Sequence, residues 1–151
     1  CPFVINQNRY SIFDRTIEKN GLKAAAKEEG VGIITFSPLE QGILTDRYLN
    51  GIPEDSRVKT DGRFLNKERL TSDKIEKARA LNELAKERGE SLAKKPNKSP
   101  KMALKWVRKD DAVTSVLIGA SRPEQILDNI KMINSPDFTE EELQKIDEIV
   151  L

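Results

Sequence analysis

The chain of 151 residues contains no histidine and only one cysteine, Cys1. Within this chain, the first absence excludes imidazole catalysis and any metal held by histidine. The second excludes an internal disulfide and a cysteine cluster for zinc, and it fits a reducing compartment. We therefore predict no metal site, and the cytoplasm is the default location.

A large net charge and long apolar runs are also missing. The 26 Lys+Arg residues nearly cancel the 25 Asp+Glu residues, so no strong field favours nucleic acid or acidic membranes. No apolar run approaches the roughly 20 residues of a membrane span, and the N-terminus does not resemble a signal peptide. We expect a soluble protein that binds no nucleic acid.

The length allows one domain over residues 1–151, with a real core. It falls short of the roughly 250 residues of a complete (β/α)8 barrel. The chain has no initial methionine and begins with an apolar run, residues 1–5, which we interpret as the cut edge of a fragment.

The first third of the chain has the pattern of a strand, a helix and a second strand. Residues 3–5 predict a short buried strand ending in the polar trio 6–8, and residues 21–29 predict a helix closed by Gly30. Residues 31–36 predict the next strand. Short links between these elements favour a parallel sheet of the α/β class.

The middle of the chain contains a long loop followed by helices. Residues 37–69 exceed the usual connection, and such loops are commonly functional or disordered. Thr71 or Ser72 caps a predicted helix to about Arg88. A second helical stripe contains Met102, Ala103, Trp106 and Val107, which we interpret as core.

Between these helices, residues 94–101 carry two prolines and four lysines. Such a loop suits an anion or an acidic partner, but a solvated loop needs neither, and we assign it no function. Ser99 and Pro100 have the pattern of a helix start.

The last third begins with a predicted strand at residues 115–118. Ser121 and Glu124 have capping-box spacing, which predicts a helix to about Ile133. Thr139 and Glu142 repeat this spacing before a predicted helix at 140–149.

Small and polar residues follow the third predicted strand. Gly119 allows close approach of a ligand, and Ser121 and Arg122 can donate to a phosphate at the helix N-terminus. Gln125 and Asn129 share a helical face and can bond a base or ribose. The alternative is an ordinary capped helix.

The other strand ends carry a similar set. Phe36 offers a flat ring that can stack on a ligand or belong to the core, and Ser37 begins a proline-containing turn. Gln7 follows the first strand, while Arg47 and Arg57 in the long loop can close over phosphates or be solvated. Together these residues indicate a ligand lying across three strand ends.

Several ordered motifs resemble the aldo-keto reductase family across nearly the whole chain. They are 5–11 (INQNRYS), 34–45 (ITFSPLEQGILT), 48–57 (YLNGIPEDSR), 103–107 (ALKWV) and 116–125 (VLIGASRPEQ). The match is strongest to the branch containing bacterial reductases of glyceraldehyde-phosphate or methylglyoxal type and potassium-channel β subunits. The resemblance implies the C-terminal half of a (β/α)8 TIM barrel, with NADPH at the strand ends, in an oxidoreductase that reduces aldehydes or ketones.

The resemblance also implies residue roles. Gln7 matches the glutamine at the nicotinamide carboxamide, and Phe36 stands where a Tyr or Trp usually stacks on the nicotinamide. The matches to the pyrophosphate loop and its cationic neighbours are Ser37, Pro38, Leu39, Gln41, Gly42, Arg47 and Arg57. Those to the adenosine end are Gly119, Ser121, Arg122, Gln125, Asp128 and Asn129. Arg122 favours NADPH over NADH.

The family's catalytic Asp, Tyr, Lys and His match nothing here, because they belong to the first half of the barrel. We therefore assign no catalytic residue, and we assign neither Tyr10 nor Tyr48 as the proton donor. The expected partners are a small carbonyl substrate and the missing N-terminal half, with a homo-oligomer left open. The alternatives are a channel-β-subunit-like NADPH sensor and a non-catalytic half-barrel.

Overall fold

The computed structural model describes residues 3–45, 48–49, 52, 70–90 and 101–151. Three parallel strands, β1 (Ile5–Arg9), β2 (Gly32–Phe36) and β3 (Val113–Val116), form one sheet in the order β1-β2-β3. The register of β1 and β2 runs from Ile5 opposite Gly32 to Arg9 opposite Phe36. The predicted α/β class with a parallel sheet is confirmed.

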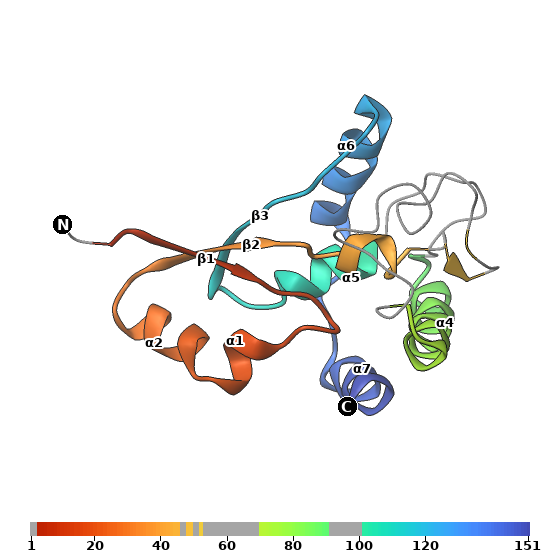
Figure 1. The fold of residues 1–151 in the computed structure, drawn as a ribbon, viewed down its shortest axis with the longest axis horizontal. Helices are drawn as coiled ribbons and strands as arrows, with labels where there is room; N and C mark the ends of the chain where they lie inside the picture. Colours follow the sequence, from red (N-terminus) through yellow and green to blue (C-terminus); the bar gives the residue numbers. More distant parts are fainter. Residues whose placement is uncertain (1–2, 46–47, 50–51, 53–69, 91–100) are drawn as a thin grey trace.

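Helices connect and cover these strands (Figure 1). In the described part of the chain the α-helices are α1 (Thr16–Lys19), α2 (Leu22–Glu28), α4 (Ser72–Glu87), α5 (Lys101–Val107), α6 (Pro123–Ile130) and α7 (Glu140–Val150). The same part contains the short 3-10 helices η1 (Glu40–Gly42), which follows β2, and η3 (Lys131–Asn134), which follows α6. In Figure 1, α6 projects away from the other helices on the side opposite α1, α2 and α7.

The core lies on one face of the sheet. Ile33 and Val113, paired across β2 and β3, are buried in it. The helices contribute side chains spaced three or four residues apart, as amphipathic packing requires. The buried helical members include Ile17, Ala26, Leu81, Ala85, Met102, Trp106 and Ile146. The interpretation of the Met102 to Val107 stripe as core is confirmed.

The opposite face of the sheet is largely uncovered by the described residues. Gln7 and Ser115, both paired with Ile34, are exposed there, and Phe36 is two residues further along the same face. Beyond β3, Leu117 is 44% exposed. The uncovered face therefore contains apolar as well as polar side chains.

The predicted bounds of two strands are wrong. Phe3 and Val4 are exposed and lie before β1, while the trio 6–8 lies inside the strand and not after it. The third strand begins two residues earlier than predicted, at Val113. In both cases backbone pairing with β2 sets the strand, and side-chain polarity does not prevent this pairing where one face is open.

The helix predictions succeed where a capping side chain marks the start. The Thr71 hydroxyl accepts from Lys74 N at 3.3 Å, and the Thr139 hydroxyl accepts from Glu142 N at 3.2 Å. The helix after the third strand ends at Ile130, three residues short of the prediction, and continues as η3. The short helix α1 was not predicted.

Candidate functional site

The carboxyl ends of the three strands meet at one edge of the sheet. Leu117 N donates to Thr35 O at 2.8 Å, so the chain leaving β3 still runs beside β2. Tyr10 N donates to Phe36 O at 3.3 Å, which holds the end of β1 to the same strand. The structure therefore brings the predicted Phe36 to Gly42 turn and the segment leaving β3 together at one edge.

The predicted nicotinamide residues share one face of the sheet. Phe36 is 36% exposed at the end of β2. Gln7 lies within β1, opposite Ile34, and not just beyond the strand as the sequence indicated. It is therefore two positions, roughly 7 Å along the strand, before the level of Phe36.

The turn after β2 adopts an unusual backbone. Ser37, Glu40 and Gln41 have φ values of 55°, 47° and 57°, and Gly42 has 95°. A left-handed conformation costs a non-glycine residue roughly 1–3 kcal/mol, and such residues concentrate at ligand-binding turns. Gln41 Nε2 donates to Ser37 Oγ at 3.0 Å and closes the turn.

Glu40, which no sequence motif singled out as a site residue, anchors this turn. Its side chain is buried, accepts from Ser11 Oγ at 3.4 Å and lies 3.8 Å from Lys74 Nζ. It therefore joins the turn to the exit of β1 and to the start of α4. The signal available in the sequence is an acid between the predicted ligand residues Leu39 and Gln41.

The hydrogen bonds that cap α6, after β3, differ from the predicted ones. The N-cap of α6 is Arg122, not Ser121, and the reaching side chain is Gln125, not Glu124. The Gln125 Oε1 atom accepts from Ser121 N at 2.8 Å, from Ser121 Oγ at 3.2 Å and from Arg122 N at 3.3 Å. An arginine has no acceptor atom, so the cap is formed by Gln125 alone.

This arrangement changes which groups can meet an anion. Two amides expected to face a ligand donate to Gln125, and Pro123 has no N–H. Gly119, Ser121 and Arg122 are exposed, and a Cβ on Gly119 would meet nothing within 4 Å. The Ser121 hydroxyl also donates its one hydrogen to Gln125, so an anion at this end would depend mainly on the side chain of Arg122.

The remaining predicted residues have mixed environments. Asn129 is only 5% exposed, and the Asp128 carboxylate pairs with Lys131. Pro38 is buried, and Leu39 is half-buried and packs against the core. Arg47 and Arg57 lie outside the described residues.

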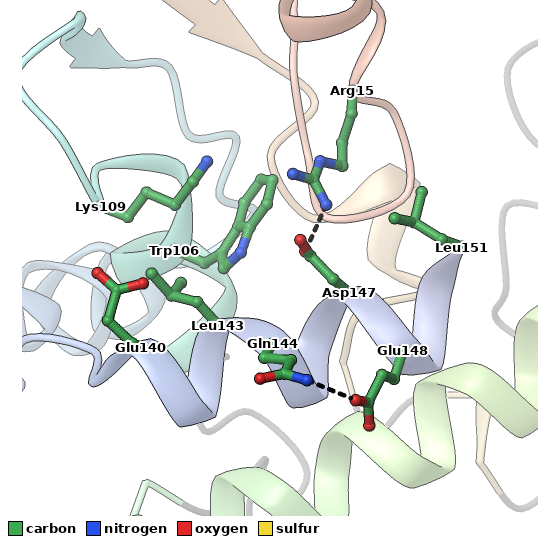
Figure 2. Close-up of a pocket in the computed structure, with 9 residues that line it drawn as sticks. All are labelled: Arg15, Trp106, Lys109, Glu140, Leu143, Gln144, Asp147, Glu148 and Leu151. Atoms are coloured by element: carbon green, nitrogen blue, oxygen red, sulfur yellow. Dashed lines mark hydrogen bonds and ion pairs between the residues drawn. The ribbon is translucent and has the colours of Figure 1, made fainter.

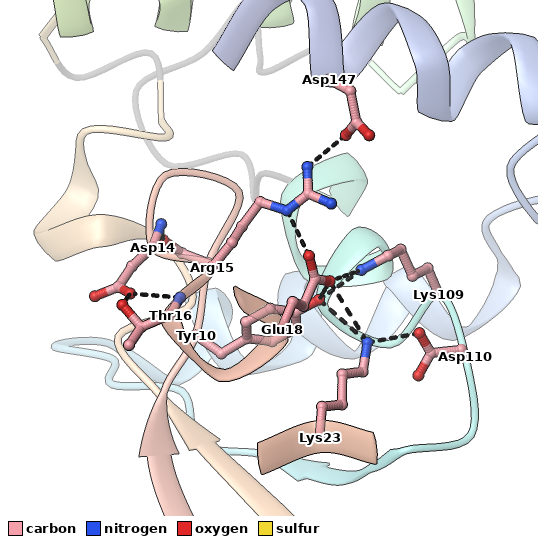
Figure 3. Close-up of polar contacts among 10 residues, drawn as sticks. Tyr10, Asp14, Arg15, Thr16, Glu18, Lys23, Lys109, Asp110 and Asp147 are labelled. Atoms are coloured by element: carbon pink, nitrogen blue, oxygen red, sulfur yellow. Dashed lines mark hydrogen bonds and ion pairs between the residues drawn. The ribbon is translucent and has the colours of Figure 1, made fainter. Parts of the chain in front are cut away.

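A buried polar cluster around Tyr10 lies near the exit of β1 (Figure 3). The Tyr10 hydroxyl donates to Glu18 and accepts from Lys109 and, at 3.3 Å, from Lys23. Burial raises the pKa of Tyr10 above its ordinary value, and the hydrogen bond to Glu18 adds to this shift. Burial lowers the pKa of Lys109.

The Tyr10 cluster has the residue types of a proton-transfer site but not the access. Tyr10 is 0% exposed, so a substrate carbonyl cannot approach its hydroxyl in this structure. Lys109 Nζ also lies 3.8 Å from the centre of the Trp106 ring, which fills the space on that side. The cluster is therefore a structural connection between α1, α2 and the segment before β3.

The cavity between α5 and α7 does not coincide with the strand ends (Figure 2). It has a volume of about 630 Å³, and none of the predicted cofactor residues lines it. The lining residues are Arg15, Trp106, Lys109, Glu140, Leu143, Gln144, Asp147, Glu148 and Leu151. Arg15 already pairs with Asp147 across it, so the cavity is not assigned to the cofactor.

Two further features are absent from the described part of the chain. None of its helices is long and apolar enough to span a bilayer. It contains no group of three or more His, Cys, Asp or Glu side chains arranged to hold a metal ion.

A parallel sheet with helices on one face and small-residue turns at the carboxyl edge defines an α/β protein with its candidate ligand site at the strand ends. The family model of the aldo/keto reductase family matches residues 1–151. The chain belongs to the aldo/keto reductase family, and the resemblance predicted from the motifs is confirmed.

Relatives include an enzyme and a protein named for a channel subunit. The chain is 45% identical over 150 residues to L-glyceraldehyde 3-phosphate reductase of Escherichia coli K12, covering 97% of this chain and 41% of that protein. It is 33% identical over 151 residues to a protein of Schizosaccharomyces pombe named for the voltage-gated potassium channel β subunits, covering 97% and 42%. The chain thus spans about two fifths of the length of these relatives.

Solved structures share the fold. Glycerol dehydrogenase of Gluconobacter oxydans matches with a TM-score of 0.75 at 24% identity, over 99% of this chain and 42% of that one. A thermostable aldo-keto reductase in complex with the inhibitor epalrestat matches with a TM-score of 0.64 at 23% identity, over 98% and 40%.

Proposed function

We propose that this chain is the NADPH-binding part of a reductase that acts on aldehydes or ketones. In this proposal residues 1–151 form one domain, the C-terminal part of a (β/α)8 barrel. The uncovered sheet face, with Gln7 and Phe36 on it, becomes the barrel interior. The remaining strands, the catalytic residues and most of the substrate pocket then come from chain outside these residues, and a cytoplasmic location suits the reaction.

One observation carries the proposal: the Phe36 turn and the segment leaving β3 lie side by side at the carboxyl edge. The hydrogen bond from Leu117 N to Thr35 O holds them there. An extended dinucleotide needs an aromatic face at one end, close backbone approach in the middle and a cation near a 2′-phosphate. Phe36, the left-handed turn at Ser37 and the exposed Arg122 meet these three needs.

When bound, NADPH supplies the hydride, and this chain's residues hold the dinucleotide. Phe36 presents its ring to the nicotinamide, and Gln7 on the same face supplies amide donors and acceptors. Gly42 and the turn from Ser37 to Gln41 approach the pyrophosphate, while Arg122 engages the 2′-phosphate. Ser121 joins this contact when its hydroxyl turns from Gln125 to the phosphate. Asp128 and Asn129 are further proposed contacts at the adenosine end of the cofactor, and Arg47 and Arg57 are proposed cationic neighbours of the pyrophosphate loop.

The relatives' names favour two uses of such a site. A phosphorylated small aldehyde is the substrate class indicated by the relative at 45% identity. A regulatory role beside a membrane channel is the second candidate, supported by the relative at 33% identity. Steady oxidation of NADPH on addition of glyceraldehyde 3-phosphate supports the first role; binding of NADPH without turnover of any aldehyde supports the second.

The test of the cofactor assignment is titration of the intact protein with NADPH and NADH, read by nicotinamide fluorescence. Arg122→Ala should weaken the binding of NADPH by roughly tenfold or more, because a charge-assisted contact to phosphate is worth about 1.5–3 kcal/mol. NADH, which lacks the 2′-phosphate, should lose little. Arg108→Ala, at an exposed position that precedes β3 in the chain, is the matched control.

Equal losses of affinity for NADPH and NADH in Arg122→Ala would refute the role of Arg122. No fluorescence change with either cofactor at saturating concentration would refute the cofactor proposal itself.

A further inference from the structure

Gln125 uses a single oxygen to hold two consecutive residues. Its Oε1 accepts from Ser121 N, Ser121 Oγ and Arg122 N at 2.8, 3.2 and 3.3 Å. In addition, Gln125 N donates to Arg122 O at 3.1 Å. The glutamine therefore holds the backbone of Arg122 through both its N–H and its C=O.

Little else fixes this stretch of chain. Residues 118–122 are described throughout, and in them no backbone or side-chain hydrogen bond occurs other than those to Gln125. The preceding anchor is Leu117 N on Thr35 O, and the following one is the start of α6 at Pro123. Gly119, Ala120 and Ser121 are exposed, so packing does not order them either.

We infer that Gln125 is a positioning residue that orders the segment 118–122 so that the guanidinium of Arg122 is presented to the cofactor phosphate. This inference rests on the proposed NADPH site, and it assigns Gln125 a role different from direct contact with the adenosine. A segment already ordered before binding loses less conformational entropy when the ligand arrives, which increases affinity without adding a contact.

The role depends on the acceptor oxygen and not on the amide nitrogen of Gln125. A carboxylate at this position keeps an acceptor for all three donors, whereas a methionine of similar length does not. Gln125→Glu and Gln125→Met therefore separate positioning from a direct contact through Nε2. Ile126→Met, an exposed neighbour on the same helix, controls for a methionine on α6.

The first readout is hydrogen exchange of the Ser121 and Arg122 amides in the intact protein without cofactor. Gln125→Met should accelerate both by roughly fivefold or more, which corresponds to the loss of one ordinary hydrogen bond. Gln125→Glu and Ile126→Met should leave both near the wild-type rate.

The second readout is NADPH affinity, measured at about 0.5 M NaCl, where a Debye length of roughly 4 Å screens the added charge of Gln125→Glu. Gln125→Met should weaken NADPH binding by roughly five- to tenfold, whereas Gln125→Glu should keep most of the wild-type affinity.

Three outcomes would overturn the inference. The first is unchanged amide exchange in Gln125→Met, and the second is faster exchange with unchanged NADPH affinity. The third is a Gln125→Glu protein that keeps slow exchange but loses as much affinity as Gln125→Met, which would indicate direct contact through Nε2. If wild-type protein binds no NADPH, the proposed function and this inference both fail, while the exchange data still report whether Gln125 orders the segment.

Discussion

At the scale of single residues, Glu18 is the centre of the buried polar cluster. It accepts from Lys109 Nζ at 2.6 Å and from Arg15 Nε at 2.5 Å, and Tyr10 donates to it as well. Burial opposes ionisation of its carboxyl, but these hydrogen bonds, led by Lys109, lower the pKa of Glu18 to about 2. The ionised carboxylate thus stabilises the folded chain.

The sign of the resulting pH dependence follows from the lowered pKa. Because the folded-state pKa of Glu18 is about 2 and its ordinary value is 4.5, its contribution is complete above 4.5 and is lost as the pH falls toward 2. The contribution at neutral pH is roughly 3 kcal/mol, at about 1.4 kcal/mol per pKa unit.

Glu18→Gln should therefore lower the free energy of unfolding at pH 7 and flatten its decline between pH 4.5 and 2. Urea unfolding across this pH range measures both effects, with the exposed Glu28→Gln on α2 as the control. A Glu18→Gln protein as stable as the control at pH 7 would contradict the assignment.

At the scale of elements, Arg88 joins the end of α4 to the start of α7. Its side chain is 3% exposed, and Nε donates to Glu90 at 2.8 Å while Nη1 donates to Glu142. Glu142 is also the side chain that accepts from Thr139 N at 2.8 Å in the cap of α7. The guanidinium lies 4.1 Å from the centre of the Phe138 ring. The Arg88 guanidinium therefore connects α4 to α7 and to the side chain that caps α7.

We expect Arg88→Met to lower the free energy of unfolding by about 3–5 kcal/mol, since it leaves the carboxylate of Glu90 buried without its partner. Arg88→Met combined with Glu90→Gln should recover part of this loss. Lys86→Met, at an exposed position paired with Glu83, should cost less than about 1 kcal/mol. Equal losses in Arg88→Met and Lys86→Met, by urea unfolding, would show that the Arg88 contacts contribute little.

At the scale of the whole molecule, the described residues leave two apolar surfaces uncovered. One is the open sheet face with Ile5, Phe36 and Leu117, and the other surrounds α6, which projects in Figure 1. The exposed apolar residues on α6 and η3 are Ile126, Leu127, Ile130 and Ile133. In addition, β1 and β3 each pair with one strand only among the described residues, which leaves sheet edges able to pair with another chain.

Residues 1–151 expressed alone should therefore bind the dye ANS and associate with increasing concentration, because exposed apolar patches of this kind drive self-association. Sedimentation velocity measures the species present. Leu127→Glu with Ile130→Lys should reduce the association without disturbing the core. A 17.1 kDa species at all concentrations, with no ANS fluorescence, would contradict the expectation.

Local patterns predicted much of the fold. The start of α4 at Thr71 and of α7 at Thr139 follows from capping side chains within three residues of their partners. The buried stripe around Trp106 follows from helical periodicity. Such interactions are short-range, so they can be recognised in an unaligned sequence.

The predicted cap of α6 was wrong because two side chains compete for the same backbone amides. Ser121 and Glu124 have the right spacing for a capping box, but Gln125 reaches the same amides from the next position. Spacing alone does not distinguish these alternatives, because either side chain is long enough to reach the backbone. The roles of the predicted cofactor residues remain proposals for the same reason, since the motifs specify neighbours in the chain and not a bound ligand.

By itself, the sequence determined the α/β class, the starts of α4 and α7, the family and the absence of histidine chemistry from this chain. Tertiary structure alone decided the strand bounds, the burial of Tyr10 beneath Lys109, and the meeting of the Phe36 turn with the segment after β3. Strand pairing and buried hydrogen bonds join residues far apart in the chain, such as Tyr10 and Lys109, and no local pattern specifies which distant partner satisfies a given group.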